Sequence, residues 1–253
     1  MLRHRRNPIA FVVVAALSVA ACGVSADARP TLGARQDAVG TTTTTSAPYT
    51  SRIAAPIGTE IAVHAAPDAA SSAETYPNPW PLDDDPAHVV PQVFLVVGQQ
   101  GSWVEVLLPV RPNGTTGWVR TRDVRLTQNN YRITVELAAH RITVYDGDTI
   151  ILEEPIAVGK AATPTPVGTY YLRVLLRAPD PNTVYGPYAY GLSGHSDVLT
   201  SFNGGDGELG IHGNNDASVL GTDASAGCVR MSNDGITRLA GILPLGTPVE
   251  ITA

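Results

Sequence analysis

The stretch that decides the fold and the chemistry of this chain is residues 211–236, IHGNNDASVLGTDASAGCVRMSNDGI. It holds His212 and Cys228, and Cys228 is the only cysteine outside the N-terminal leader region. A thiol reacts as a nucleophile in its thiolate form, and a neighbouring imidazole commonly removes the proton near neutral pH. Gly213 and Gly227 allow tight turns beside the sulfur, where backbone amides could meet a developing oxyanion. The stretch therefore predicts a cysteine acyl-transfer site.

The sequence around this stretch, residues 130–253, is predicted to form a mainly β domain. Residues 131–137 alternate apolar and polar side chains, as a half-buried strand does. Asp146-Gly147-Asp148 separates two further segments, and Asp-Gly between alternating segments favours a hairpin. The strands expected here are 131–137, 140–145, 149–158 and 169–175. One or two short helices are expected, and one of them starts at 232–234, where short polar side chains can cap it.

The preceding part, residues 51–127, is predicted to form a small antiparallel barrel. Its strand-length apolar segments are bounded by Gly, Asn and Pro, and they are 61–63, 93–97, 103–107 and 117–120. The acidic, Pro-rich insertion 73–91 is expected to be a long surface loop. Trp103 and Trp118 lie in alternating patterns and are expected in the core, whereas Trp80 in the insertion is expected to be exposed.

The N-terminus, residues 1–21, is predicted to be a signal peptide. Basic MLRHRRN precedes an apolar run that is short for a bilayer span and ends in Val19-Ala20-Ala21-Cys22. This ending resembles the bacterial lipoprotein box, whose cysteine is lipidated, so an exported protein anchored to the membrane and facing the cell wall or periplasm is expected. The alternative is ordinary cleavage nearby, with Cys22 discarded or left free. Residues 22–50 contain a Thr run and are expected to be a disordered tether.

The net charge and the spacing of possible metal ligands argue against two classes of function, nucleic-acid binding and metal binding. The formal charge of -6 disfavours nucleic-acid binding, which needs a concentrated basic surface. Neither Cys-x-x-Cys nor His-Glu-x-x-His occurs, and His195, His212 and Cys228 alone lack the spacing of metal ligands. No metal and no cofactor are therefore expected, and the protein is expected to be a monomer.

The order of three motifs is similar to that of the L,D-transpeptidase catalytic domain of the YkuD type. The motifs are the loop TPTPVGTY at 163–170, then His212-Gly213, then SAGCVRM at 225–231. The resemblance covers about 131–252 and includes a closing strand at 245–251. In the preceding part, the hairpin whose second strand begins Gly-Trp-Val at 117–119 resembles the bacterial Src-homology-3-like barrel that accompanies cell-wall enzymes.

The resemblance implies roles for the residues of the central stretch. Cys228 would be the nucleophile, and His212 its base and later the acid for the leaving amine. The main-chain carbonyl of Gly213 would orient the imidazole, the amides of Gly227 and Cys228 would form much of the oxyanion hole, and Ser225 would brace the loop. Many members carry a second histidine where this chain has alanine at 226.

The remaining site residues are expected to bind substrate or to lie at the surface. The Arg230 guanidinium could brace the loop or hold a substrate carboxylate bidentately. Tyr188 and Gly191 belong to a segment expected to cap the cleft and are candidate substrate contacts. His195 is expected to be a solvated loop histidine, and Asp206, Glu208 and Asp216 are expected to be surface charges.

The function implied is that of a peptidoglycan L,D-transpeptidase involved in cell-wall organisation and cell shape. Such an enzyme attacks a stem tetrapeptide, releases D-alanine and forms 3→3 cross-links through a cysteine thioester, and it is a target of carbapenems. Two alternatives remain: an L,D-carboxypeptidase or exchange enzyme on the same fold, and a wall-binding lipoprotein without activity. A sortase also places His before Cys, but its arginine lies further downstream than the gap from Cys228 to Arg230.

Overall fold

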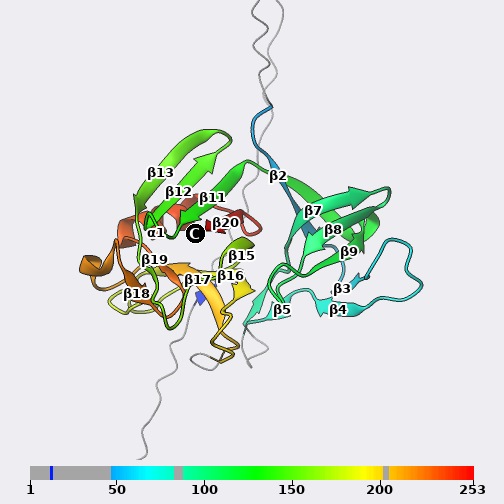
Figure 1. Cartoon of the computed structure of the whole chain (residues 1–253). Helices are drawn as coiled ribbons and strands as arrows, with labels where there is room; N and C mark the ends of the chain where they lie inside the picture. The colour runs from blue at the N-terminus through cyan, green and yellow to red at the C-terminus, as the bar shows by residue number, and fades with distance from the viewer. Residues whose placement is uncertain (1–11, 14–46, 83–87, 202–204) are drawn as a thin grey trace, which may run out of the picture.

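The computed structural model describes residues 12–13, 47–82, 88–201 and 205–253, and two β-sheets dominate them (Figure 1). Strands make up 49% and helices 8% of the structure, so the predicted mainly β fold class is confirmed. Among the described residues, no helix has the length and hydrophobicity needed to cross a bilayer. The leader, the lipidation residue Cys22 and most of the predicted tether lie outside the described residues.

The smaller sheet is antiparallel throughout, with the order β10-β2-β7-β8-β9. Its strands are β2 (Ser51–Pro56), β7 (Phe94–Gln100), β8 (Trp103–Leu107), β9 (Thr116–Arg120) and β10 (Val124–Asn129), with the short helix η1 (Thr121–Asp123) before β10. A bridge between His64 and Trp118 brings the end of β3 (Glu60–Val63) to β9. The expected strands of this region all form, because each apolar segment supplies alternate side chains to one core.

The insertion expected to be a loop instead folds back onto the molecule. It contains β4 (Glu74–Pro77), which pairs with β3, and β5 (Trp80–Pro81), which pairs with β6 (Val89–Val90). Trp80 is only 7% exposed and packs with Val90 and Val174, while the Arg173 guanidinium lies 3.8 Å above its ring. The prediction of an exposed Trp80 was wrong, because burying this large apolar ring outweighs the polar composition of its neighbours. Trp103 is buried as predicted, whereas Trp118 remains partly exposed.

The larger sheet has the order β13-β12-β11-β20-β15-β16-β17-β19, and β1 (Val12–Val13) also pairs with β15. Its strands are β11 (Tyr131–Glu136), β12 (Arg141–Asp146), β13 (Thr149–Pro155), β15 (Gly168–Arg177), β16 (Tyr188–His195), β17 (Glu208–His212), β19 (Val229–Arg230) and β20 (Pro248–Thr252). Most neighbours are antiparallel, but β11–β20 and β17–β19 are parallel. A separate parallel pair joins β14 (Val158–Gly159) to β18 (Asp223–Ser225).

Two local predictions for this region are confirmed. Strands β12 and β13 form a hairpin in which Asp146 pairs with Thr149, and Gly147 takes the left-handed conformation (φ 58°) that such tight turns require. Helix α1 (Asn233–Ile242) begins after Ser232, whose hydroxyl accepts a hydrogen bond from the Gly235 amide at 2.9 Å. The short helix η2 (Ala217–Val219) lies between β17 and β18.

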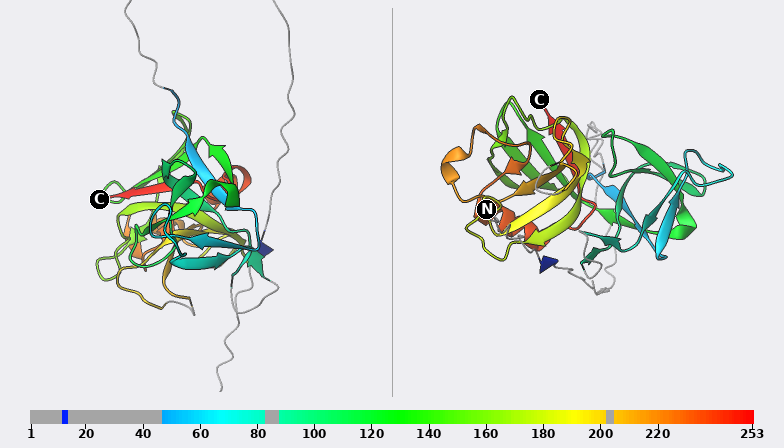
Figure 2. Two further views of the ribbon diagram at one scale, coloured as in Figure 1. Left: turned by 90° about the vertical axis from the view of Figure 1, so that its right-hand side faces the viewer. Right: turned by 90° about the horizontal axis from the view of Figure 1, so that it is seen from below.

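The two sheets lie side by side and are joined by one residue, Asn130, between β10 and β11 (Figure 2). Asn129 donates a buried hydrogen bond of 3.1 Å to Thr247 Oγ1, next to the closing strand β20. Tyr171 of β15 is fully buried and packs into the core of the smaller sheet. The contact between the sheets is therefore apolar at its centre and hydrogen-bonded at the link.

Candidate active site

The pairing of β17 with β19 sets the geometry of the candidate site. The strands are parallel, with Ile211 opposite Val229 and His212 opposite Arg230. Side chains alternate between the two faces of a strand, so the buried pair Ile211 and Val229 faces the core, and His212 and Arg230 face away from it. The sulfur of Cys228 lies beside Gly210, where an added Cβ would be 3.8 Å from Sγ. Cys228 immediately precedes β19 and His212 ends β17, so the thiol and the imidazole lie on the same face of this parallel pair.

The imidazole of His212 is held from two sides and is 3% exposed. Its Nδ1 lies 2.6 Å from the carbonyl oxygen of Gly213, and the Tyr185 ring lies 5.0 Å from it, centroid to centroid. Burial lowers the pKa of His212 to about 4, although hydrogen bonds to the Gly213 and Val184 carbonyls oppose the shift. With Nδ1 protonated and donating to Gly213, the neutral ring carries its lone pair on Nε2.

The thiol of Cys228 is also held in its neutral form. Cys228 is partly buried, and burial raises the pKa of its thiol, while a Gly210 backbone hydrogen bond and the charge of Arg230 lower it. At neutral pH the pair is thus a thiol beside an imidazole, not a thiolate beside an imidazolium. A nucleophilic reaction of this thiol would therefore require transfer of its proton.

The turn that carries Cys228 is closed by Ser225. Its hydroxyl donates to the Cys228 carbonyl at 2.6 Å and accepts from the Gly227 amide at 3.0 Å. Gly227 has φ 121°, a conformation that side chains rarely adopt. The Gly227 amide, expected to face an oxyanion, is thus engaged by Ser225 in this structure.

A second layer, missed at the sequence level, supports this turn from the loop after β14. Thr165 is buried; its Oγ1 accepts from the Gly159 amide and donates to the Gly227 carbonyl, both at 2.8 Å. The Lys160 amide donates to the Ser225 carbonyl at 3.1 Å. The sequence showed a rigid Thr-Pro-Thr-Pro loop, but its partner lies 62 residues away, so no local pattern could assign it.

The segment that covers His212 is 178–187, between β15 and β16. It contributes Val184 and Tyr185, and Gly186 lies so close to Gly213 that an added Cβ would be 2.7 Å from the Gly213 Cα. The expectation that 188–195 caps the cleft was wrong, because these residues form β16, an interior strand.

The candidate substrate residues occupy different places in the fold. Gly191 pairs with Gly210, one strand away from the thiol, and Tyr188 is partly buried at the start of β16. Arg230 is fixed through its backbone to Ala157 by two hydrogen bonds of 2.8 Å. Its Nε is buried and has no hydrogen-bond partner among the described residues.

A hollow of about 490 Å³ lies against the segment that follows Gly213 in the chain. It is lined by Pro181, Asn182, Asn214, Asn215, Ala217, Ser232, Asn233 and Asp234. Two of these lining residues are joined by a hydrogen bond, in which the backbone N–H of Asn214 donates to Asn233 Oδ1 at 2.9 Å. None of Arg230, Tyr188 and Gly191 lines this hollow.

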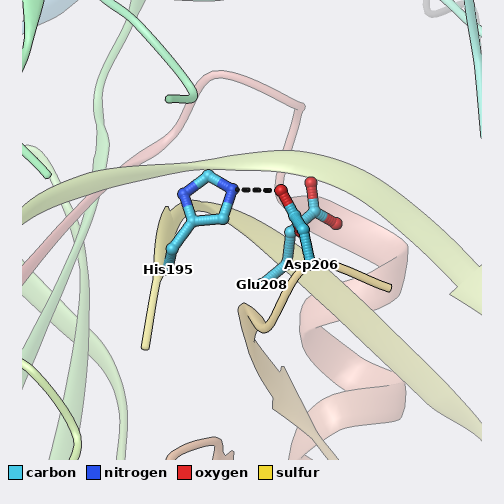
Figure 3. Close-up of side chains that lie close together, drawn as sticks. All are labelled: His195, Asp206 and Glu208. Atoms are coloured by element: carbon cyan, nitrogen blue, oxygen red, sulfur yellow. Dashed lines mark ion pairs between the residues drawn. The ribbon is translucent and has the colours of Figure 1, made fainter. Parts of the chain in front are cut away.

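His195 differs from its prediction as a solvated loop histidine. It lies in β16, is 2% exposed, and its Nε2 is 3.0 Å from Asp206 Oδ2 (Figure 3). Glu208 lies beside them, and among the described residues these three are the one group of His, Cys, Asp and Glu with the spacing of a metal site. The prediction failed because strand pairing, not local sequence, buries the ring.

The part of the chain that contains these residues is similar to known proteins. Residues 130–251 match the family model of the YkuD-type L,D-transpeptidase catalytic domain. A candidate L,D-transpeptidase, YkuD, from Bacillus licheniformis is 38% identical over 122 residues, and its counterpart from Bacillus subtilis strain 168 is 35% identical over 121 residues. Each match covers 48% of this chain and, respectively, 66% and 65% of the relative, just under two thirds of its length. L,D-transpeptidase 3 from Mycobacterium tuberculosis, solved with a faropenem-derived adduct, is 16% identical over 64% of this chain and 91% of its own, with a TM-score of 0.41.

Proposed function

We propose that this protein is a peptidoglycan L,D-transpeptidase that acts through a thioester on Cys228, because residues 130–251 match the family model of the YkuD-type L,D-transpeptidase catalytic domain. The observation that supports the proposal is that Cys228, just before β19, and His212, at the end of β17, lie on the same face of this parallel pair, with Nδ1 of His212 directed to the Gly213 carbonyl. The ring nitrogen left for catalysis is then Nε2, which can accept a proton from the thiol.

The first half-reaction begins from the neutral pair. Cys228 Sγ attacks the carbonyl carbon of the amide between the L-centre of diaminopimelate and the terminal D-alanine of a tetrapeptide, while His212 Nε2 takes the thiol proton. The imidazolium that forms is stabilised by carbonyl oxygens, including those of Gly213 and Val184, which favour the protonated ring. His212 then returns the proton to the leaving nitrogen, and D-alanine departs from the thioester.

The second half-reaction forms the 3→3 cross-link. The side-chain amine of a neighbouring diaminopimelate attacks the thioester carbon and loses a proton to His212, and the Cys228 sulfur leaves as the thiol after taking the proton back. Water in place of the amine would give carboxypeptidase activity, and a D-amino acid would give exchange. Both alternatives use the same two residues.

The Cys228 amide is the oxyanion donor that we assign. The Gly227 amide is already bonded to Ser225 Oγ, so Gly227 contributes chiefly its left-handed backbone conformation. Removal of a single oxyanion donor typically costs about 3–4 kcal/mol of transition-state stabilisation. The hollow lined by Asn214 and its neighbours would supply asparagine side chains, Asn182 and Asn215 among them, to bind the backbone of the stem peptide.

The rest of the chain is proposed to hold this domain near its substrate. Residues 1–21 would direct export, lipidation of Cys22 would anchor the protein, and 22–50 would span from membrane to wall. The part at 51–127 would be a Src-homology-3-like barrel, which the five-stranded antiparallel sheet supports. We propose a monomer that is inactivated by carbapenems.

The direct test incubates the purified full chain with a disaccharide tetrapeptide and follows products by mass spectrometry. D-alanine release with a cross-linked dimer is expected, and a carbapenem should add one adduct mass on Cys228. Cys228→Ala should abolish both, whereas Cys228→Ala with full dimer formation would refute the mechanism. D-alanine release without dimer would assign the carboxypeptidase reaction instead.

A further inference from the structure

We propose that His195, Asp206 and Glu208 form a binding site for a divalent transition-metal ion of the Zn²⁺ type. One imidazole nitrogen and two carboxylate oxygens of these residues all lie within 4.8 Å of one another. Figure 3 shows the His195 ring directed at Asp206, with the Glu208 carboxylate beside it. The inference does not depend on the proposed transpeptidase activity.

The fold, rather than chance at a surface, brings the three residues together. His195 is the last residue of β16 and Glu208 the first of β17, and the two are paired in the ladder. Asp206 precedes Glu208 by two residues, and the Ser196 amide donates to the Gly207 carbonyl at 2.9 Å just beyond the ladder. The three side chains thus lie where the 196–207 connection leaves and re-enters the sheet.

The three residues differ in burial: the imidazole is buried and the two acidic residues are exposed. His195 is 2% exposed, and its Nδ1 is buried without a hydrogen-bond partner among the described residues. The Asp206 side chain is 64% exposed and that of Glu208 34%. The ring nitrogen that faces the two carboxylates is Nε2, so an ion reached through them would be bound by Nε2, while Nδ1 lies on the far side of the ring.

The donor set selects the class of ion. Imidazole nitrogen favours Zn²⁺ and its first-row neighbours, whereas Ca²⁺ and Mg²⁺ take oxygen ligands. Zinc binds nitrogen and carboxylate oxygen at about 2.0–2.2 Å, so tetrahedral ligand atoms lie roughly 3.4 Å apart. The 3.0 Å separation of His195 Nε2 and Asp206 Oδ2 is near this value. Glu208 would approach by a rotamer change, keeping one oxygen for Arg173, with which it forms an ion pair.

The proposed ion would lie next to a segment that is already hydrogen-bonded to the smaller sheet. Arg111, between β8 and β9, donates to the carbonyls of Ser196 at 2.5 Å, Leu199 at 3.1 Å and Asp206 at 2.6 Å. Asn113 donates to the His195 carbonyl at 2.8 Å and accepts from its amide at 2.9 Å. Metal binding would therefore stabilise the adjoining ends of β16 and β17 and their contact with the smaller sheet.

The test is a calorimetric titration of Zn²⁺ into the untagged, EDTA-treated full chain that carries Cys228→Ala. This background removes the catalytic thiol as a competing ligand for the ion. One Zn²⁺ per chain is expected, together with a higher melting temperature and no comparable response to Ca²⁺. Co²⁺ should give visible d–d bands without thiolate charge transfer.

Ligand variants assign the titration to this site. His195→Gln and Asp206→Asn in the same background should each weaken Zn²⁺ binding at least tenfold. His140→Gln is the matched control, because His140 Nε2 also contacts a carboxylate, Asp223 Oδ1 at 2.8 Å, and neither belongs to the group of three. Asp206→Asn alters an exposed side chain, so it decides the matter if His195→Gln fails to fold. Equal affinity in Asp206→Asn and its parent, or no Zn²⁺ binding by the parent, would overturn the proposal.

Discussion

Replacing His212 with asparagine should make the protein less sensitive to acid. The pKa of His212 is lowered from 6.5 to about 4 in the folded protein by burial, so the unfolded chain binds this proton first. Stability is therefore lost as pH falls through the window from 6.5 to about 4, and it is unaffected by this group above that window. The two pKa values give a loss of about 2 kcal/mol at pH ~5 and about 3 kcal/mol at pH ~4.

Urea unfolding at several pH values between ~7.5 and ~4.5, followed by tryptophan fluorescence, measures this loss. Contributions of other titrating groups are shared by both proteins and cancel in the difference between wild type and His212→Asn. The variant should lose about 2 kcal/mol less than wild type between pH ~7.5 and ~5. His140→Gln, which removes a partly exposed ring, controls for loss of a histidine as such. Parallel stability curves for wild type and His212→Asn would refute the assignment of a buried neutral imidazole.

Three further predictions concern the nucleophile, its support and the insertion. Cys228→Ala should lower the rate of D-alanine release by at least roughly 10³-fold while leaving the melting temperature near that of wild type, measured by coupled assay and calorimetry. Thr165→Val should leave the Gly159 amide and the Gly227 carbonyl unpaired. We expect a loss of about 1–3 kcal/mol in urea unfolding and a lower kcat with little change in KM; an unchanged kcat would contradict the positioning role. Trp80→Ala should destabilise the protein by about 3–5 kcal/mol, because the ring is buried between the sheets, and a loss within experimental error would contradict that packing.

The sequence predicted those parts of the fold that rest on local patterns. The alternation of apolar and polar side chains predicted β11 and β12, and the Asp-Gly turn predicted the hairpin that leads into β13. Ser232 predicted the start of α1. These signals are short-range, because the side-chain period and the capping residue lie within the element itself. Cys228 and His212 were predicted as catalytic from residue chemistry and the order of motifs, and their roles stay predictions.

The features that the sequence could not predict depend on contacts between distant segments. Trp80 is buried because β5 packs against Val174, which lies in another sheet, and nothing near Trp80 encodes that partner. His195 is buried by pairing with Glu208 across a connection of twelve residues, 196–207. Thr165 likewise meets Gly227 only once β14 and β18 pair. In each case, the surroundings of the side chain form only when segments that are distant in the sequence come together in the fold.

The protonated state of Cys228 also bears on how readily its sulfur is oxidised, which matters most if the protein is exported as proposed. Peroxides and other oxidants attack the thiolate, and exported proteins meet them without the cytosolic reducing systems. A sulfur that keeps its proton beside Gly210 until a substrate carbonyl arrives offers such reagents little to oxidise. The burial that raises the pKa of the thiol thus protects Cys228 from sulfenic acid formation.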